Sequence, residues 1–171
     1  FPFLSRLAFV GGRLLFFADD GTTGSELWAS DGTPGGTSLL EDLVPGPASS
    51  FFGGSPPDAL LLAPGAMYFR VYTGSPGEGP QLWRSDGTAA GTVFVDRLDN
   101  QPSAFHLGLF GTVQADVPLA DLGGVVLAQA GTGTTGAEIS RSDGSPGGTF
   151  VLADVVPGPR SGAPDGFTAL G

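Results

Sequence analysis

Acidic side chains that lie close together in the sequence are the first candidates for chemistry, because hard cations such as calcium bind carboxylate oxygens. Asp19 and Asp20 precede a glycine, and Glu26 follows shortly after them. From a hairpin, these three carboxylates could bracket a calcium ion. Two later stretches, VYTGSPGEG and AGTGTTGAE, otherwise resemble this one but lack the paired Asp, and no EF-hand spacing is present. Both facts favour the competing interpretation, which is a solvated acidic turn.

Groups that could catalyse covalent chemistry are scarce. The chain has no Cys, and its single histidine, His106, lies between apolar residues in SAFHLGLF, which is more typical of a packed residue than of a general base. The glycine-rich run at 131–136 resembles a phosphate loop, but no Lys follows it and no helix is indicated. Paired carboxylates can hydrolyse glycosides, yet many Asp residues here recur at one repeated position, which indicates a structural role. The sequence therefore predicts a protein that is not an enzyme and has no cofactor other than the calcium considered above.

Ligand binding is a more serious candidate than catalysis. Exposed aromatic side chains beside Asp and Arg are the usual contacts for sugars. The chain offers Tyr72, Arg84 and Arg141 for this purpose, together with Trp28 and Trp83. The alternative is that both tryptophans fill space between packed sheets and that the two arginines pair with neighbouring carboxylates. The sequence leaves glycan binding open.

Composition excludes several classes of partner. In 171 residues, 17 acidic side chains face only 7 basic ones, so the net charge is −10. This field repels a phosphate backbone, and no basic cluster interleaves with aromatics to overcome it, so we expect no nucleic-acid partner. No apolar run is long enough to cross a membrane, and no leader follows Phe1, so we expect no membrane insertion and a chain that begins after processing or as an excerpt.

A twelve-residue motif occurs three times, as ELWASDGTPGGT, QLWRSDGTAAGT and EISRSDGSPGGT. The central aspartates are 55 and 57 residues apart (31 to 86 and 86 to 143). Each Asp-Gly pair suits a turn that needs positive φ and an acceptor for nearby amides. The third copy has Ser140 at the tryptophan position, which predicts looser or different packing there. The motif positions are Glu26, Leu27, Trp28, Asp31, Gly32 and Thr37, then Gln81, Leu82, Trp83, Asp86, Gly87 and Thr92, and finally Asp143, Gly144 and Thr149.

The segments around the motif alternate between apolar and turn-forming residues, which predicts four short strands in every repeat and no helix. In the first repeat we expect the strands at 7–10, 13–18, 25–30 and 38–44. Four antiparallel strands recurring every fifty-odd residues are typical of a β-propeller blade, whose apolar faces pack against neighbouring blades. The sequence predicts an all-β chain of three consecutive four-stranded antiparallel blades, at 1–50, 51–106 and 107–166, with 167–171 as the first strand of a following blade.

The motif and the apolar strand and Pro-Gly turn that follow it resemble the bacterial ELWxxDGT repeat proteins, also described as hyalin-repeat-like, over essentially the whole chain. The match is close in the first copy. The second copy has Gln81 for Glu and Arg97 where the first has Asp42, and the third lacks the Trp. The resemblance implies a propeller-like architecture in large bacterial proteins that are secreted or exposed at the cell surface.

Three blades alone would leave two apolar faces and two sheet edges unprotected. Either the chain is a segment of a longer ring, or further copies associate with it to complete one. We therefore expect a structural or protein-interaction module of an extracellular or cell-surface protein, whose partners are other proteins or further copies of the repeat. A glycan-binding propeller is the alternative.

Overall fold

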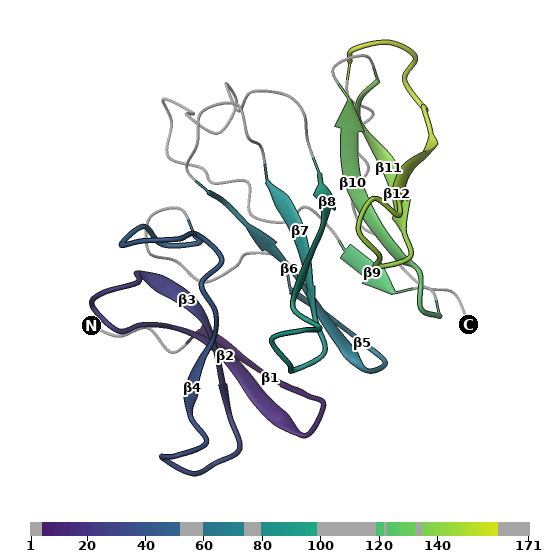
Figure 1. The fold of residues 1–171 in the computed structure, drawn as a ribbon. Helices are drawn as coiled ribbons and strands as arrows, with labels where there is room; N and C mark the ends of the chain where they lie inside the picture. Colours follow the sequence, from purple (N-terminus) through teal and green to yellow (C-terminus); the bar gives the residue numbers. More distant parts are fainter. Residues whose placement is uncertain are drawn as a thin grey trace.

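The computed structural model describes residues 5–51, 60–73, 80–98, 119–121, 123–132 and 135–160 of the 171. These residues form twelve strands in three separate four-stranded antiparallel sheets, and no helix occurs among them. Figure 1 shows the three sheets side by side in chain order, from purple through teal to green. The prediction of an all-β chain with four-stranded antiparallel units is confirmed for this part of the molecule.

Each sheet is a meander in which consecutive strands pair. Sheet A contains β1 (Ser5–Val10), β2 (Arg13–Asp19), β3 (Ser25–Ser30) and β4 (Ser38–Glu41). Sheet B contains β5 (Leu60–Ala63), β6 (Ala66–Val71), β7 (Gln81–Ser85) and β8 (Val93–Arg97). Sheet C contains β9 (Leu119–Asp121), β10 (Val126–Thr132), β11 (Gly136–Ser142) and β12 (Thr149–Ala153). Each sheet lies within one of the predicted repeat units, whereas His106 and the segment 167–171 lie outside the described residues.

One predicted strand is longer than the observed one. We expected the fourth strand of the first repeat to reach residue 44, but β4 ends at Glu41. The Leu43 N–H donates a hydrogen bond to the buried Glu26 side chain at 2.8 Å, so this amide is not available to a strand partner. A side-chain acceptor thus ends the strand, which alternation of apolar residues does not reveal.

Because neighbouring residues in a strand point to opposite faces, each sheet has two faces that are defined by the motif. We call the side of Trp28, Trp83 and Ser140 the Trp face, and the side of Leu27, Leu82 and Ile139 the Leu face. The register places these residues at equivalent points of the three sheets, since β2 pairs with β3, β6 with β7 and β10 with β11 through the same motif positions.

The first hydrophobic core lies between sheets A and B. The Leu face of sheet A contributes Leu15, Phe17 and Leu27, and the Trp face of sheet B contributes Met67 and Phe69, with Trp83 packed against the cluster. The rings of Phe17 and Phe69 meet edge to face with centroids 5.5 Å apart. The contact between the two sheets is therefore continuous and apolar.

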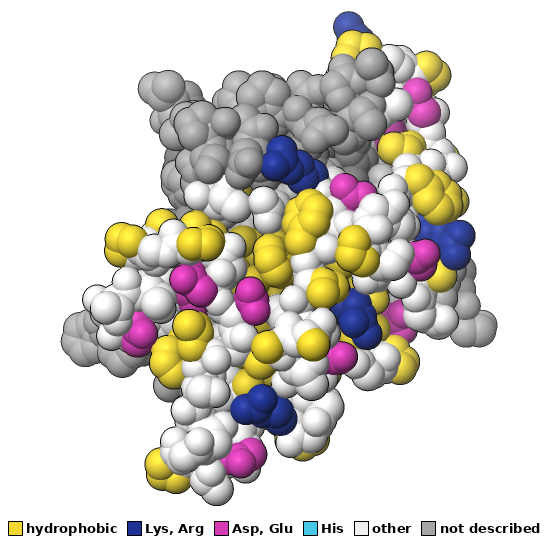
Figure 2. Space-filling view, in the orientation of Figure 1, with side chains coloured by type: hydrophobic (Ala, Val, Ile, Leu, Met, Phe, Trp, Pro, Cys, Tyr) yellow, Lys and Arg dark blue, Asp and Glu magenta, His cyan; other side chains and the backbone are white. Residues whose placement is uncertain are grey.

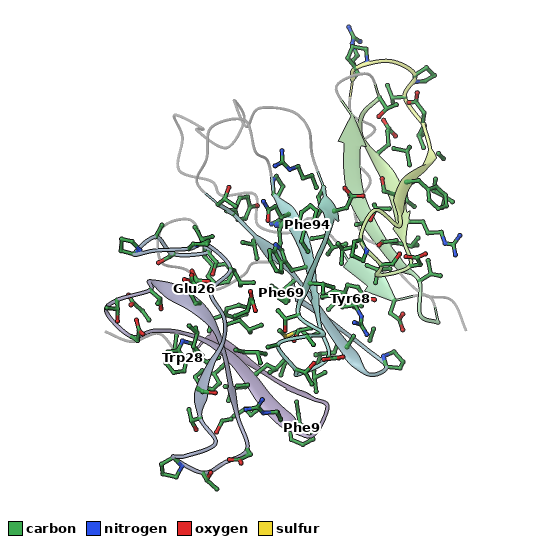
Figure 3. The ribbon with its side chains drawn as sticks, in the orientation of Figure 1. Phe9, Glu26, Trp28, Tyr68, Phe69 and Phe94 are labelled. Atoms are coloured by element: carbon green, nitrogen blue, oxygen red, sulfur yellow. The ribbon has the colours of Figure 1, made fainter. Side chains whose placement is uncertain are left out.

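The second core lies between sheets B and C and repeats this arrangement. The Leu face of sheet B contributes Tyr68, Leu82 and Val95, and the Trp face of sheet C contributes Val126 and Ala128. Figure 3 shows Phe69 and Tyr68 on opposite sides of β6, as expected for a strand that is buried on both faces. Sheet B is thus enclosed between its two neighbours.

The connection after sheet A fixes sheet A to sheet B through backbone hydrogen bonds. The Ser50 N–H donates to the Ser25 carbonyl at 3.1 Å, and the Ser50 carbonyl accepts from the Tyr72 N–H at 2.9 Å. Phe51 follows and packs edge to face against Phe17 at 4.6 Å. This short segment therefore bridges the end of β6 and the start of β3.

Candidate functional site

The repeated motif forms one local structure, which we call the corner, between the third and fourth strands of each sheet. In the first corner, the Asp31 carboxylate accepts the Thr33 N–H at 2.9 Å and the Thr33 hydroxyl at 2.7 Å. Asp86 and Thr88 make the same pair of bonds in the second corner, as do Asp143 and Ser145 in the third. The motif aspartates are therefore committed to closing their own turns, as turn chemistry predicts.

These hydrogen bonds also fix the ionisation of the motif aspartates. The side-chain hydroxyl of Thr33 and its backbone amide hold the pKa of Asp31 below its usual value. Thr88 lowers the pKa of Asp86, and Ser145 lowers the pKa of Asp143, in the same way. All three are stabilised as carboxylates, which is opposite to the tuning that a general acid requires.

In the first two corners, the serine before the aspartate and the threonine at the end of the motif are joined by a hydrogen bond. Ser30 and Thr37 share a hydrogen bond between their hydroxyls at 2.7 Å, and Ser85 and Thr92 share one at 2.8 Å. The Thr149 hydroxyl in the third corner is buried and makes no hydrogen bond. The third corner therefore keeps the Asp-centred bonds but lacks this closing pair.

Two glycine positions recur in every corner, and glycine is required at each of them for a different structural reason. Gly32, Gly87 and Gly144 have positive φ values of 92°, 92° and 79°, a region that side chains disfavour. The later glycines of the corners, Gly36 and Gly91, do not have positive φ, but a Cβ on either would overlap the carboxylate of the corner aspartate. The aspartate side chain folds over a backbone position that only glycine leaves open.

The corners of the second and third repeats pack against the preceding sheet. A Cβ on Gly87 would lie 2.7 Å from the Val10 carbonyl oxygen at the turn between β1 and β2. Gly144 lies against the Tyr68 hydroxyl of β6, and the Gly147 N–H donates to the Val95 carbonyl of β8 at 2.9 Å. By contrast, none of the described residues lies within 4 Å of a Cβ placed on Gly32. The motif therefore joins successive sheets as well as successive strands.

The first motif position carries a buried side chain that binds the chain after the fourth strand. Glu26 and Glu138 are both completely buried, and their carboxylates accept the N–H of Leu43 at 2.8 Å and of Val155 at 3.1 Å. In the second repeat, Gln81 instead accepts the Trp83 indole N–H at 2.9 Å, while the Leu98 N–H donates to the Pro80 carbonyl. Burial raises the pKa of Glu26 to about 7.

The three side chains predicted to bracket a calcium ion do not come together, which corrects that hypothesis. Glu26, which is labelled in Figure 3, is completely buried, whereas Asp19 and Asp20 are exposed and accept hydrogen bonds from amides of their own turn. The backbone amides of Thr23 and Thr22 lower the pKa of Asp20 to about 2. Among the described residues, no group of three or more His, Cys, Asp or Glu side chains could hold a metal ion. The strand pairing sends Glu26 inward, which the sequence spacing alone does not reveal.

The residues proposed for glycan contact are not gathered in one place. Arg84 pairs with Tyr68 on β6, whereas Tyr72 follows the opposite end of that strand and packs beneath the Arg70 guanidinium, 5.2 Å from its ring centroid. Arg141 lies on the Leu face of sheet C, over the Phe150 ring at 5.6 Å. No single site therefore contains all three side chains.

Sequence reasoning missed several residues on which these contacts depend. Ser30, Ser85 and Ser142 each accept the N–H of the positive-φ glycine of their corner, and their recurrence in the motif was the available signal. Tyr68 and Val10 receive the corners of the next repeat, and nothing in the local sequence marks them, because the contact joins different sheets.

No family model, curated protein or solved structure matches the chain. The described residues include no helix that is long and apolar enough to cross a membrane.

Proposed function

We propose that this chain is a non-enzymatic structural or protein-interaction module in which three β-propeller blades stack through their repeated corners. The observation that carries the proposal is that every repeat uses its motif for the same structural task. Asp31, Asp86 and Asp143 are engaged within their own turns, and the corners of the second and third repeats pack on the sheet before them. Residues engaged in this way are poorly placed to act on a substrate.

The blade arrangement is supported by where the sheets approach one another. Among strands of different sheets, β1 with β6 and β5 with β9 make the most extensive contacts, and β1, β5 and β9 are the first strands of their sheets. Packing in which each sheet meets the next through its first strands is what an arrangement around a common axis requires.

The proposal assigns the chain to a secreted or surface-exposed bacterial repeat protein, and this part rests on the resemblance of the motif to the ELWxxDGT repeats. The acidic surface, with a net charge of −10, is compatible with such a location because it favours solubility.

An experimental structure tests the architecture. We expect the rotation from sheet A to sheet B to be nearly equal to that from sheet B to sheet C, about one axis that passes beside β1, β5 and β9. Two unrelated rotations would contradict the propeller.

Binding and activity assays test the function. We expect no retention on a glycan array and no hydrolysis of ester, glycoside or peptide substrates. Glycan binding that is lost in Tyr72→Ala or Arg84→Ala but kept in a control such as Thr22→Ala, an exposed turn residue, would instead favour a lectin. Hydrolysis of any of the substrates would overturn the non-enzymatic assignment.

A further inference from the structure

The outward face of sheet C is the equivalent of a face that is buried in the other two sheets. Leu152 is 51% exposed, whereas Leu40 and Val95, at the same repeat position, are buried in the two cores. Val155 is 66% exposed, whereas Leu43 at its position is 5% exposed. Since the local structure is the same, the difference arises because no described strand packs against the Leu face of sheet C.

The Trp face of sheet A shows the same difference at the other end of the stack. Leu14 and Phe16 are half-buried, although their equivalents in sheet B, Met67 and Phe69, are completely buried against sheet A. Phe9 pairs with Leu14 and is 72% exposed. Trp28, which pairs with Phe16, is half-buried on this face. Figure 3 shows Phe9 and Trp28 on sheet A, away from sheet B.

The two open faces are the two halves of a contact that the chain already makes twice. Sheet A meets sheet B, and sheet B meets sheet C, through a Leu face on one side and a Trp face on the other. Within the part of the chain that the structure describes, the stack therefore ends in an uncovered Trp face on sheet A and an uncovered Leu face on sheet C. Apolar faces of this kind are rarely left in water when a complementary face is present.

We infer that a second copy of this chain covers these faces head to tail, with the Trp face of sheet A in one copy packed on the Leu face of sheet C in the other. This contact rests on the proposed stacking function, and its partner is a second copy of the same chain. Trp28 takes the place that Trp83 has between sheets A and B, against Leu127, Ile139 and Leu152 of the other copy.

Two further features fit this contact. In the described part of the chain, no atom lies within 4 Å of a Cβ placed on Gly32, whereas the equivalent Gly87 and Gly144 contact the preceding sheet. The first corner can therefore dock on another copy. Arg141 does not oppose the contact, since Arg84 at the same repeat position is half-buried at the contact between sheets B and C. Figure 2 shows apolar side chains reaching the surface over sheet C beside a basic one.

A head-to-tail contact predicts a specific pattern of complementation. Trp28→Asp disables the sheet A face, and Leu152→Asp disables the sheet C face, while each variant keeps the other face intact. By light scattering, we expect the unaltered chain to have at least twice the one-chain mass of 17.2 kDa. Each variant alone is expected at the one-chain mass, and an equimolar mixture is expected to form a complex of two chains, one of each kind.

The controls separate this contact from other causes. Ala89→Asp adds the same charge at an exposed turn residue and should leave association unchanged. Recovery of the complex in the mixture shows that both variants fold. A one-chain mass for the unaltered protein overturns the inference but leaves the stacking function standing, because that function concerns contacts within one chain. Association that persists in either variant alone, or a mixture of folded variants that stays at the one-chain mass, overturns the head-to-tail arrangement.

Discussion

Gly87 in the second repeat lies against the backbone carbonyl of Val10 in the first sheet, so that a Cβ on this glycine would come within 2.7 Å of the Val10 oxygen. The contact joins residues that are far apart in the sequence and brings a corner of one sheet onto a turn of another. It explains why a turn motif recurs with so little variation, because the motif both reverses the chain and positions the next sheet.

Gly87→Ala and Gly32→Ala form a matched pair that measures this contact. Both glycines have φ of 92°, so alanine introduces similar backbone strain, about 1 kcal/mol, at each. Within one chain, only the Gly87 variant also clashes with a neighbouring sheet, which in dilute protein should cost a further ~1–3 kcal/mol. Chemical denaturation of the two variants measures this difference in unfolding free energy. Equal losses would show that the corner around Gly87 does not pack against sheet A.

A second matched pair tests how the aspartate folds over the corner. Alanine at Gly36 would overlap the Asp31 carboxylate, whereas alanine at Gly35 would meet open space, and neither residue has positive φ. We expect Gly36→Ala to lose about 1–3 kcal/mol of unfolding free energy and Gly35→Ala to lose none. Adding Asp31→Ala to Gly36→Ala should cost less than the sum of the two single changes. Additive losses would contradict the packing of Asp31 over Gly36.

The buried carboxyl of Glu26 should make stability depend on pH. Burial raises its pKa from 4.5 to about 7, so its contribution is fully present below pH 4.5 and is lost as the pH rises to about 7, when a buried group must ionise. Glu26→Gln, which copies Gln81 of the second repeat, removes this loss. The unfolding free energy of the variant relative to the unaltered chain should therefore rise by about 2 kcal/mol between pH 4.5 and pH 8. A difference that is independent of pH would show that Glu26 ionises normally.

The two tryptophans should differ in their effect on a single chain. Trp83 packs against the core between sheets A and B, whereas Trp28 lies on the open face of sheet A. The third repeat has serine at this position. In dilute protein, we expect Trp83→Ser to lower the unfolding free energy by about 3–5 kcal/mol and Trp28→Ser to lower it by about 1 kcal/mol. Equal costs would mean that the face carrying Trp28 is covered within the chain.

Protonation of the corner aspartates should contribute to the loss of stability at low pH. Since hydrogen bonds from Thr33, Thr88 and Ser145 lower the pKa values of their aspartates, the corner contribution is present above pH 3.8 and is lost as the pH falls below it. Asp31→Asn should flatten the profile of stability against pH in this range. An unchanged slope below pH 4 would show that Asp31 is not held as a carboxylate.

The sequence by itself determined the strands, their order and the corners, because these depend on local alternation and on residues that suit tight turns. In the first repeat, the strand predicted at 25–30 agrees with β3, whereas β1 begins two residues earlier and β2 ends one residue later than predicted, and β4 ends three residues earlier. The recurrence of Asp31, Asp86 and Asp143 was enough to predict their turn role, since their partners lie two residues away.

Tertiary structure alone decided which faces are covered and what the acidic residues do. Glu26, Asp19 and Asp20 are near one another in sequence, but strand pairing buries the first and exposes the others, so these three carboxylates do not come together. Leu152 and Val95 have the same local pattern, and only the presence of a neighbouring sheet makes one exposed and the other buried. Burial depends on contacts between segments that are distant in the sequence. Repeats with the same local sequence pattern can have different neighbours, and the pattern does not indicate which faces will be in contact.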